Sequence, residues 1–305
     1  MTAHSDALDP ADFRFRARDA DCPLARRPTR ERGPFAGEDE ARRATAETAR
    51  RLAEHQAMLE AHGTHGVLIV LQGMDAAGKD EAVHHVTSVI DPGSAAATSF
   101  ASMSGEEARQ DYLRRAAEAL PARGELAIFN RSYYERAVSD RVSPELLEAQ
   151  RLPPEALEGV EDGRLWERRL RQIRDFERYL VENGIHPVKL FFHVSAEVQR
   201  ERLLERIERP EERWDFSRAD IEKRRRWDAF LEAYDLAFRA TDSDGVPWHV
   251  IPADEPWFAR AAAAAIILGK LRSLHDDFPE PDDERRELLA WGRRQLEDEG
   301  GDPDA

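Results

Sequence analysis

Short apolar runs alternate with longer stretches of helical periodicity along most of the chain. The most apolar run is 66–72 (Gly-Val-Leu-Ile-Val-Leu-Gln), which predicts a buried strand. Four more short runs predict strands at 95–100, 126–129, 188–194 and 246–252. Helices are predicted at 38–62, 80–90, 106–120, 165–182, 196–209, 218–240 and 256–274. This alternation indicates an α/β fold, a five-stranded parallel sheet with helices on both faces.

Residues 73–79 (Gly-Met-Asp-Ala-Ala-Gly-Lys) connect the first strand to the helix that follows it. Glycines at such a turn let backbone N–H groups converge on an anion, and Lys79 adds a mobile charge for the outer phosphates. The pattern predicts a phosphate-binding loop, with Lys79 exposed at the turn. The residues expected to hold phosphate with their backbone are Gly73, Ala76, Ala77 and Gly78.

Two carboxylates distinguish this loop from the common GTPase or ATPase pattern. Asp80 stands where a Ser or Thr usually ligates Mg²⁺, and Asp75 lies inside the loop. Asp75 can hold Mg²⁺ directly or through water, because octahedral Mg²⁺ favours one or two carboxylates plus substrate oxygens. Asp80 is a candidate for the phosphate site, but the helix macrodipole alone also favours an acid in the first turn of a helix.

Polar residues follow the third predicted strand, at Asn130 and Arg131. Ligands of parallel sheets bind at the carboxyl ends of the strands, so this turn should lie beside the phosphate loop. The amide oxygen of Asn130 can ligate Mg²⁺ or its water without adding charge. Arg131 is a candidate for phosphate contact, and the alternative is a structural ion pair with Glu135 or another acid.

The formal charge of −16 is unevenly distributed. Residues 276–305 hold twelve acids and four arginines, whereas the middle of the chain is nearly neutral and rich in arginine. Arginines 202, 206 and 209 recur at spacings of four and three, which places them along one helix face where they could follow a phosphate chain. A ladder with Glu201, Glu205 and Glu208 would explain the same spacing without a function.

The composition indicates an enzyme of a reducing compartment, which we expect to be the cytoplasm. Cys22 is the single cysteine, and no signal peptide or membrane-spanning run is evident. The apolar run 259–268 is too short to cross a bilayer. We expect neither a membrane nor a nucleic acid as partner. The predicted organisation is an N-terminal arm at 1–37, one kinase domain at 38–275 and an acidic tail at 276–305.

Several motifs in order resemble the type 2 polyphosphate kinases. They are 71–80 (Leu-Gln-Gly-Met-Asp-Ala-Ala-Gly-Lys-Asp), 128–135 (Ile-Phe-Asn-Arg-Ser-Tyr-Tyr-Glu), 175–180, 191–195, Trp214 with 216–217, 227–228, 233–234 and 250–254. The resemblance implies a thymidylate-kinase-like P-loop fold of three layers, with a helical lid at about 196–226. It also implies phosphate transfer between inorganic polyphosphate and a nucleoside mono- or diphosphate, with Mg²⁺ or alternatively Mn²⁺, by a homo-oligomer (dimer or tetramer).

Carried over residue by residue, the resemblance assigns catalysis to Asp75, Lys79, Asn130 and Arg131, with Asp75 and Asn130 at the metal. Arg115 coincides with an arginine of that family. Lysines common in the family are replaced by Ala101, Asp215 and Pro256, and a tryptophan is replaced by Arg114. Arg213 and Arg114 could partly compensate for the lost cations.

Two other functions remain open at this stage. An ATP-dependent nucleoside monophosphate kinase would share the fold, the loop and the lid. A non-catalytic protein that binds polyphosphate or nucleotide would explain the missing lysines. The sequence does not fix the acceptor nucleotide or the favoured direction of transfer.

Overall fold

The computed structural model describes residues 8–15, 22–88, 90–100, 105 and 107–299. Its centre is one parallel sheet with the strand order β2-β3-β1-β4-β5. The strands are β1 (Gly66–Gly73), β2 (Ala95–Ser99), β3 (Leu126–Asn130), β4 (Ile185–His193) and β5 (Trp248–Pro252). All eight residues of β1 are buried, as expected for the central strand of a sheet that helices cover on both faces. The α/β prediction is confirmed.

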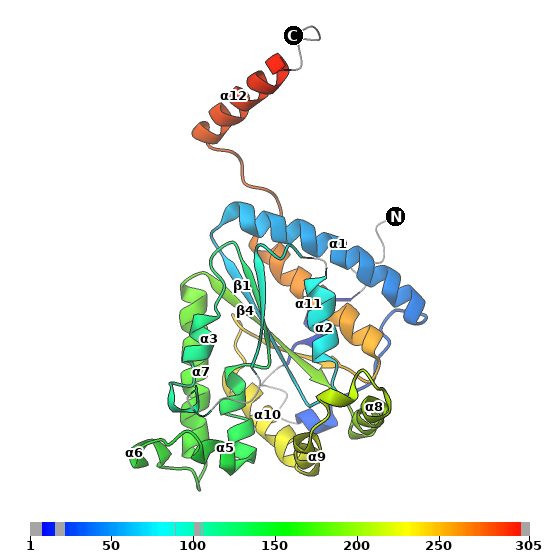
Figure 1. Ribbon diagram of the computed structural model, residues 1–305, viewed down its shortest axis with the longest axis vertical. Helices are drawn as coiled ribbons and strands as arrows, with labels where there is room; N and C mark the ends of the chain where they lie inside the picture. The colour runs from blue at the N-terminus through cyan, green and yellow to red at the C-terminus, as the bar shows by residue number, and fades with distance from the viewer. Residues whose placement is uncertain (1–7, 16–21, 89, 101–104, 106, 300–305) are drawn as a thin grey trace.

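Twelve α-helices occur in the described residues. They are α1 (Glu38–His62), α2 (Lys79–Thr87), α3 (Arg114–Glu118), α4 (Ser139–Val142), α5 (Pro144–Glu148), α6 (Pro154–Leu157), α7 (Arg164–Glu182), α8 (Ala196–Glu208), α9 (Arg218–Arg225), α10 (Trp227–Thr241), α11 (Pro256–Leu274) and α12 (Asp283–Glu299). Helices α1, α2 and α11 pack together on one side of the sheet, and α7 packs with α10 on the other (Figure 1). None of these helices is long and apolar enough to cross a membrane.

The described residues before α1 lie against this body and close part of its core. Phe15 and Leu24 have no exposed surface, and the backbone of Arg14 forms a bridge with His249 of β5. Two short 3₁₀ helices, Pro10–Phe13 and Leu24–Arg26, shape this segment. The order of the strands places the end of β1 between the ends of β3 and β4, with Leu71 opposite Asn130 and Gly73 opposite Phe192.

The prediction of one helix over 106–120 is wrong for the described residues from 107 on. The segment forms a 3₁₀ turn at Glu107–Arg109 and the short helix α3. Between them the side chain of Asp111 accepts a hydrogen bond from the backbone N–H of Leu113 at 2.9 Å. Short polar side chains compete with helical hydrogen bonds in this way, so the helix starts later than the apolar periodicity suggests.

The prediction of one helix over 218–240 is also wrong, because the chain breaks at Arg226 between α9 and α10. Arg226 has φ −105° and ψ 25°, and its guanidinium donates to the carbonyl of Val142 and the hydroxyl of Ser143, both at 3.0 Å. These bonds to a distant segment fix the break. Helix α12 lies within 276–305, where no element had been predicted.

Candidate active site

A cavity of about 960 Å³ opens at the carboxyl ends of β1 and β3. The predicted residues Asp75, Ala76, Lys79, Asp80, Asn130, Arg131 and Arg206 all line it. Its other lining residues are Glu81, His84, His85, Ser88, Ser99, Glu212, Asp215, Asp220 and Arg260. The structure therefore brings seven of the fourteen predicted site residues to one hollow, from segments that are far apart in the sequence.

The phosphate loop owes part of its path to left-handed backbone at Gly78 and Ala76. Gly78 has φ 97° and precedes the first residue of α2, and Ala76 has φ 57°, which is strained for a residue with a side chain. A side chain on Gly73 would place its Cβ 2.8 Å from the carbonyl oxygen of Phe192. The loop therefore packs closely against β4 and leads into the N-terminus of α2, where unpaired N–H groups favour an anion.

Lys79 is only 4% exposed, so the prediction that it is exposed is wrong. Its ammonium donates hydrogen bonds to the carbonyl oxygens of Gly73 at 2.9 Å and Met74 at 2.7 Å. Burial, together with the positive charge of Arg131, lowers the pKa of Lys79 to about 8. The ammonium of Lys79 is therefore bonded to the backbone of its own loop.

Asp75 is held between two cations. Its Oδ1 accepts a hydrogen bond from Arg131 Nη2 at 2.6 Å, and its Oδ2 lies 3.0 Å from the ammonium of Lys223 on α9. Burial raises the pKa of Asp75, but the positive charges of Lys223, Arg131 and Lys79 outweigh this and keep the pKa below its usual range. The carboxylate of Asp75 is therefore ionised, which is the form that binds a cation.

Asn130 and Asp80 contact each other across the cavity. The amide Nδ2 of Asn130 donates to Asp80 Oδ1 at 2.5 Å. Asp80 therefore has a specific side-chain partner in addition to its position in the first turn of α2. For Arg131, the alternative of an ion pair is the observed state, and its partner is Asp75 rather than Glu135. The side chain of Arg131 remains 30% exposed along the cavity wall.

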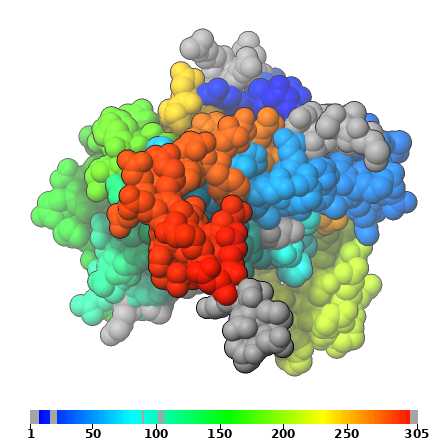
Figure 2. Space-filling view, turned by 90° about the horizontal axis from the view of Figure 1, so that it is seen from above, coloured from blue at the N-terminus to red at the C-terminus, as the bar shows by residue number. Residues whose placement is uncertain are grey.

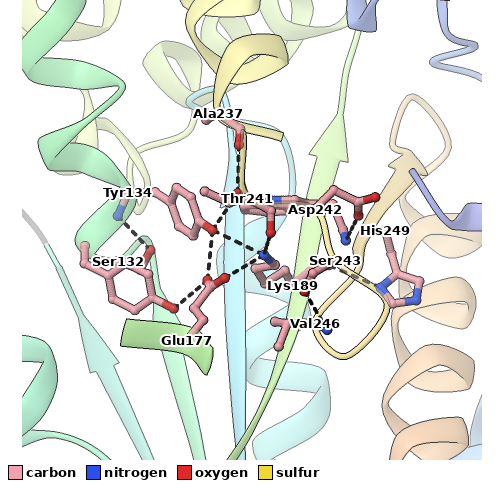
Figure 3. Close-up of polar contacts among 12 residues, drawn as sticks. Ser132, Tyr134, Glu177, Lys189, Ala237, Thr241, Asp242, Ser243, Val246 and His249 are labelled. Carbon is pink, nitrogen blue, oxygen red and sulfur yellow. Dashed lines mark hydrogen bonds and ion pairs between the residues drawn. The ribbon is translucent and has the colours of Figure 1, made fainter. Parts of the chain in front are cut away.

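A buried polar network fixes the turn that carries Arg131, whose φ of 61° is left-handed. Ser132 Oγ accepts from the N–H of Tyr134 at 3.2 Å, and the hydroxyl of Tyr134 donates to Glu177 at 2.8 Å (Figure 3). Glu177 in turn pairs with the ammonium of Lys189 at 2.7 Å. The network ties the turn after β3 to α7 and β4 beneath the site.

Helix α8 anchors the phosphate loop by two side chains. Arg202 donates to the carbonyl of Ala76 at 3.0 Å, and Gln199 donates to the carbonyl of Asp75 at 2.9 Å. Arg202 also reaches the carbonyls of Ala253 and Asp254. It therefore holds the loop in place, whereas Arg206 is the member of the arginine row that lines the cavity.

The other predicted cations have different surroundings. Arg209 pairs with Glu205 at 3.6 Å, which is one of the acids in the ladder alternative. It also pairs with Glu212 at 2.8 Å, which that alternative did not include. Arg115 donates to the carbonyl of Ser99 at 2.9 Å. Arg213 lies in the 3₁₀ turn Arg213–Asp215 and approaches the carbonyl of Glu208 at 3.5 Å. None of these three lines the cavity.

Among the substituted positions, Asp215 lines the cavity and adds a negative charge to it. Pro256 occupies the first turn of α11, where proline fits the helix. Arg114 pairs with Glu118 on the exposed face of α3. Ala101 lies outside the described residues.

Sequence reasoning missed Lys223 and Gln199. Both reach Asp75 from segments that lie far along the chain, Lys223 through the carboxylate and Gln199 through the carbonyl. A capping box between Ser217 and Asp220 starts α9 one turn before Lys223, and this signal is visible in the sequence. It locates the helix but not the partner of Lys223.

A lysine-bearing, glycine-containing loop between a buried strand and a helix, covered by further helices, defines a P-loop kinase fold. Residues 36–279 match the family model of polyphosphate kinase 2 (PPK2). The protein belongs to this family and is a kinase-type enzyme, which confirms the resemblance.

Two curated relatives and one solved structure support the assignment. The chain is 40% identical to an ADP-polyphosphate phosphotransferase of Rhodopseudomonas palustris, over 81% of this chain and 84% of that protein. It is 39% identical to an AMP/ADP-polyphosphate phosphotransferase of Meiothermus ruber, over 81% and 86%. The crystal structure of polyphosphate kinase 2 from Arthrobacter aurescens TC1 matches 93% of this chain and 97% of that chain, with a TM-score of 0.80 and 32% identity.

Proposed function

We propose that the protein transfers a phosphoryl group between inorganic polyphosphate and a nucleoside mono- or diphosphate in this cavity. The observation that carries the proposal is the convergence of Asp75, Lys79 and Arg131 in one hollow of about 960 Å³ on a P-loop fold. The names of the two relatives, which cite ADP and AMP together with polyphosphate, support the same substrates for this chain.

Phosphoryl transfer depends mainly on positioning the two substrates and on neutralising the charge of the transferred phosphoryl group. A terminal phosphate oxygen of the acceptor attacks the terminal phosphorus of the donor, and the bond from that phosphorus to the bridging oxygen breaks. The ammonium of Lys79 would exchange the carbonyls of Gly73 and Met74 for phosphate oxygens. Arg131 would bind the transferred group from the opposite wall. The lid helices α8 and α9 would exclude water from the reaction.

The residues present fit a divalent cation with oxygen ligands. In the described residues, Asp75 Oδ2 is buried and accepts no hydrogen bond of good geometry, although Lys223 lies 3.0 Å away. The amide nitrogen of Asn130 is engaged by Asp80, which leaves its oxygen for a cation. Within the described part of the chain, no three His, Cys, Asp or Glu side chains form a metal cluster, so substrate oxygens must complete the shell. Bound Mg²⁺ or Mn²⁺ would neutralise phosphate charge.

A matrix of donors and acceptors tests the proposal. Long-chain polyphosphate and ATP are each combined with AMP, ADP, GMP and GDP in the presence of Mg²⁺ or Mn²⁺. We expect transfer from polyphosphate to at least one nucleotide. Transfer from ATP to a monophosphate at normal rates without polyphosphate would instead identify a nucleoside monophosphate kinase. Binding without turnover under every condition would identify a non-catalytic protein.

Paired variants test the metal ligands. Asp75→Asn should slow turnover about a hundredfold or more even at high Mg²⁺, because it removes the buried charge that would face the cation. Asn130→Asp should be tolerated at saturating Mg²⁺, because the cation can then offset the two carboxylates that replace the hydrogen bond between Asn130 and Asp80. Wild-type activity in Asp75→Asn would remove Asp75 from the metal site.

A further inference from the structure

Two histidines meet at the end of the sheet opposite to the phosphate loop. His65 directly precedes β1, and His186 is the second residue of β4, where it lies beside Val67 in the parallel register. The length of β1 separates this pair from Gly73 by about 25 Å. Figure 2 looks onto this end of the molecule, where α1 in blue and α11 in orange lie side by side behind α12 in red. The pair is therefore remote from the cavity.

The two rings present their nitrogens to each other. Nε2 of His186 lies 3.1 Å from Nδ1 of His65, and the ring planes make an angle of 62°. A hydrogen bond of this length needs one proton between the two nitrogens. Two imidazole nitrogens on one metal ion, each at about 2.0 to 2.1 Å and roughly 90° to 109° apart, are separated by about 2.9 to 3.4 Å. The observed distance therefore also matches one edge of a metal coordination shell.

The pair is accessible, and His186 is neutral at pH 7. Both side chains are only half-buried, so an ion can reach them from solvent. Burial, together with the positive charges of Lys270 and His65, lowers the pKa of His186 to about 4. Metal ions bind the neutral imidazole, so at pH 7 an ion does not compete with a charged form of His186. The charge of Lys270, on α11, repels an ion here and limits its affinity.

Two further histidines lie beside the pair and make other contacts. The rings of His62 and His275 stack with their centroids 3.7 Å apart, and Nε2 of His62 donates to the carbonyl of Asp277 at 3.0 Å. Within the part of the chain that the structure describes, no three His, Cys, Asp or Glu side chains form a ready ligand set. The protein therefore supplies two ligands at this place, and water completes the shell.

We propose that His65 and His186 form a binding site for a transition-metal ion. Imidazole nitrogens favour Cu²⁺, Ni²⁺ and Zn²⁺, whereas Mg²⁺ favours oxygen ligands such as those in the cavity. A bound ion joins the turn before β1 to β4 by a link that the hydrogen bonds of the sheet do not supply. It binds the folded chain, in which the two rings are already placed, and so stabilises it. The inference does not rest on the proposed function.

Thermal unfolding of the untagged full chain tests the site. After treatment with EDTA, Ni²⁺ or Zn²⁺ should raise the melting temperature of the wild type. His65→Ala and His186→Ala should need at least about tenfold more metal for the same rise, because a single imidazole holds the ion more weakly. Melting in EDTA shows whether the variants fold. Mg²⁺ should act equally on all three proteins, since its oxygen ligands lie elsewhere.

His62→Ala is the matched control. It removes an imidazole from the same cluster without touching the pair, so it should keep the full response to Ni²⁺ and Zn²⁺. The proposal is overturned if the wild type shows no metal-dependent rise or if His65→Ala responds as the wild type does. Loss of the response in His62→Ala also overturns it, because the ligands would then be other rings.

Paramagnetic resonance of bound Cu²⁺ identifies the ligands independently of stability. In a Cys22→Ser background, one equivalent of Cu²⁺ should show hyperfine coupling to the nitrogens of two imidazoles. His65→Asn should reduce this coupling to one imidazole, and His62→Asn should leave it unchanged. A spectrum without imidazole coupling, or one that His65→Asn leaves unaltered, contradicts the assignment of the two ligands.

Discussion

Lys79 couples phosphate binding to a proton. Burial lowers the pKa of Lys79 to about 8, and phosphate oxygens around its ammonium would raise that pKa. Binding should therefore take up a proton near pH 8.5, and affinity for polyphosphate should fall up to about tenfold per pH unit above 8. Calorimetry in two buffers of different ionisation enthalpy measures the uptake.

Lys79→Met is the control for this prediction and also tests catalysis. It should abolish the proton uptake and lower kcat/KM at least about a hundredfold, because a charge-assisted contact that tightens in the transition state is lost. A variant that folds and keeps the same uptake would assign the proton to another group. One that keeps more than about a tenth of the rate would remove Lys79 from the catalytic site.

Lys223 stands where a cation would approach Asp75, which predicts competition. Lys223→Gln should bind Mn²⁺ about fivefold more tightly in the absence of substrate, since a partly exposed ion pair is worth up to about 1 kcal/mol. Paramagnetic resonance of unbound Mn²⁺ measures this affinity. Arg225→Gln removes the same charge from the exposed face of α9 and should have little effect. Equal gains in both variants would show a general effect of charge.

At the residue scale, the sequence was sufficient to predict the location of side chains that belong to a local motif. Asp75, Lys79, Asn130 and Arg131 were predicted near one another because strand ends of a parallel sheet share an edge, and they line one cavity. The ion pair of Lys223 with Asp75 could not be predicted, because it depends on how a distant helix folds over the loop. Their roles in catalysis stay predictions until the variants are measured.

Among the elements, β4 and α7 are joined by the buried ion pair of Lys189 and Glu177. Lys189→Met should lower the free energy of unfolding by about 3 to 5 kcal/mol, because it leaves the carboxylate of Glu177 buried without its partner. Lys189→Met/Glu177→Gln should recover most of this loss, since the amide oxygen still accepts from Tyr134. Urea unfolding of both variants checks the prediction. A double variant no more stable than the single one would refute the charge as the cause.

Elements were predictable from sequence where burial alone determines them. The strands were found because they are short apolar runs bounded by turns, and α1, α7 and α11 because they are long and periodic. The breaks at Asp111 and Arg226 were missed, since both depend on side chains that bond to backbone. The short helices α4, α5 and α6 carry too few residues for a periodicity to show.

Across the whole molecule, charge is separated from the reaction site. The cavity lining holds both signs, with Lys79, Arg131, Arg206 and Arg260 beside six acids, while the acids of 276–299 lie on a segment that does not line the cavity. The net charge of −16 therefore says little about the affinity of the cavity for a polyanion. Local cations decide that affinity, because exposed charges beyond a Debye length of about 8 Å are largely screened.

Stability of the whole molecule should fall in mild acid. Burial lowers the pKa of His186, His193 and His249 to about 4 each. Their folded-state pKa lies below the unfolded value of about 6.5, so the unfolded chain takes up protons that the folded chain does not. The contribution of each histidine is complete above about pH 6.5 and is lost progressively as the pH falls toward 4.

His193→Leu isolates one of these contributions. His193 is 3% exposed, and within the described residues neither ring nitrogen makes a hydrogen bond of good geometry. The wild type should lose about 1.4 kcal/mol per pH unit for this residue between pH 6 and 5, and the variant should not. Urea unfolding at pH 7.5, 6 and 5 gives the two slopes. The stability of the variant should depend less steeply on pH, because the proton of His193 no longer contributes. Some dependence should remain, because His186 and His249 still titrate. Parallel slopes for the two proteins would mean that His193 is protonated equally in both states.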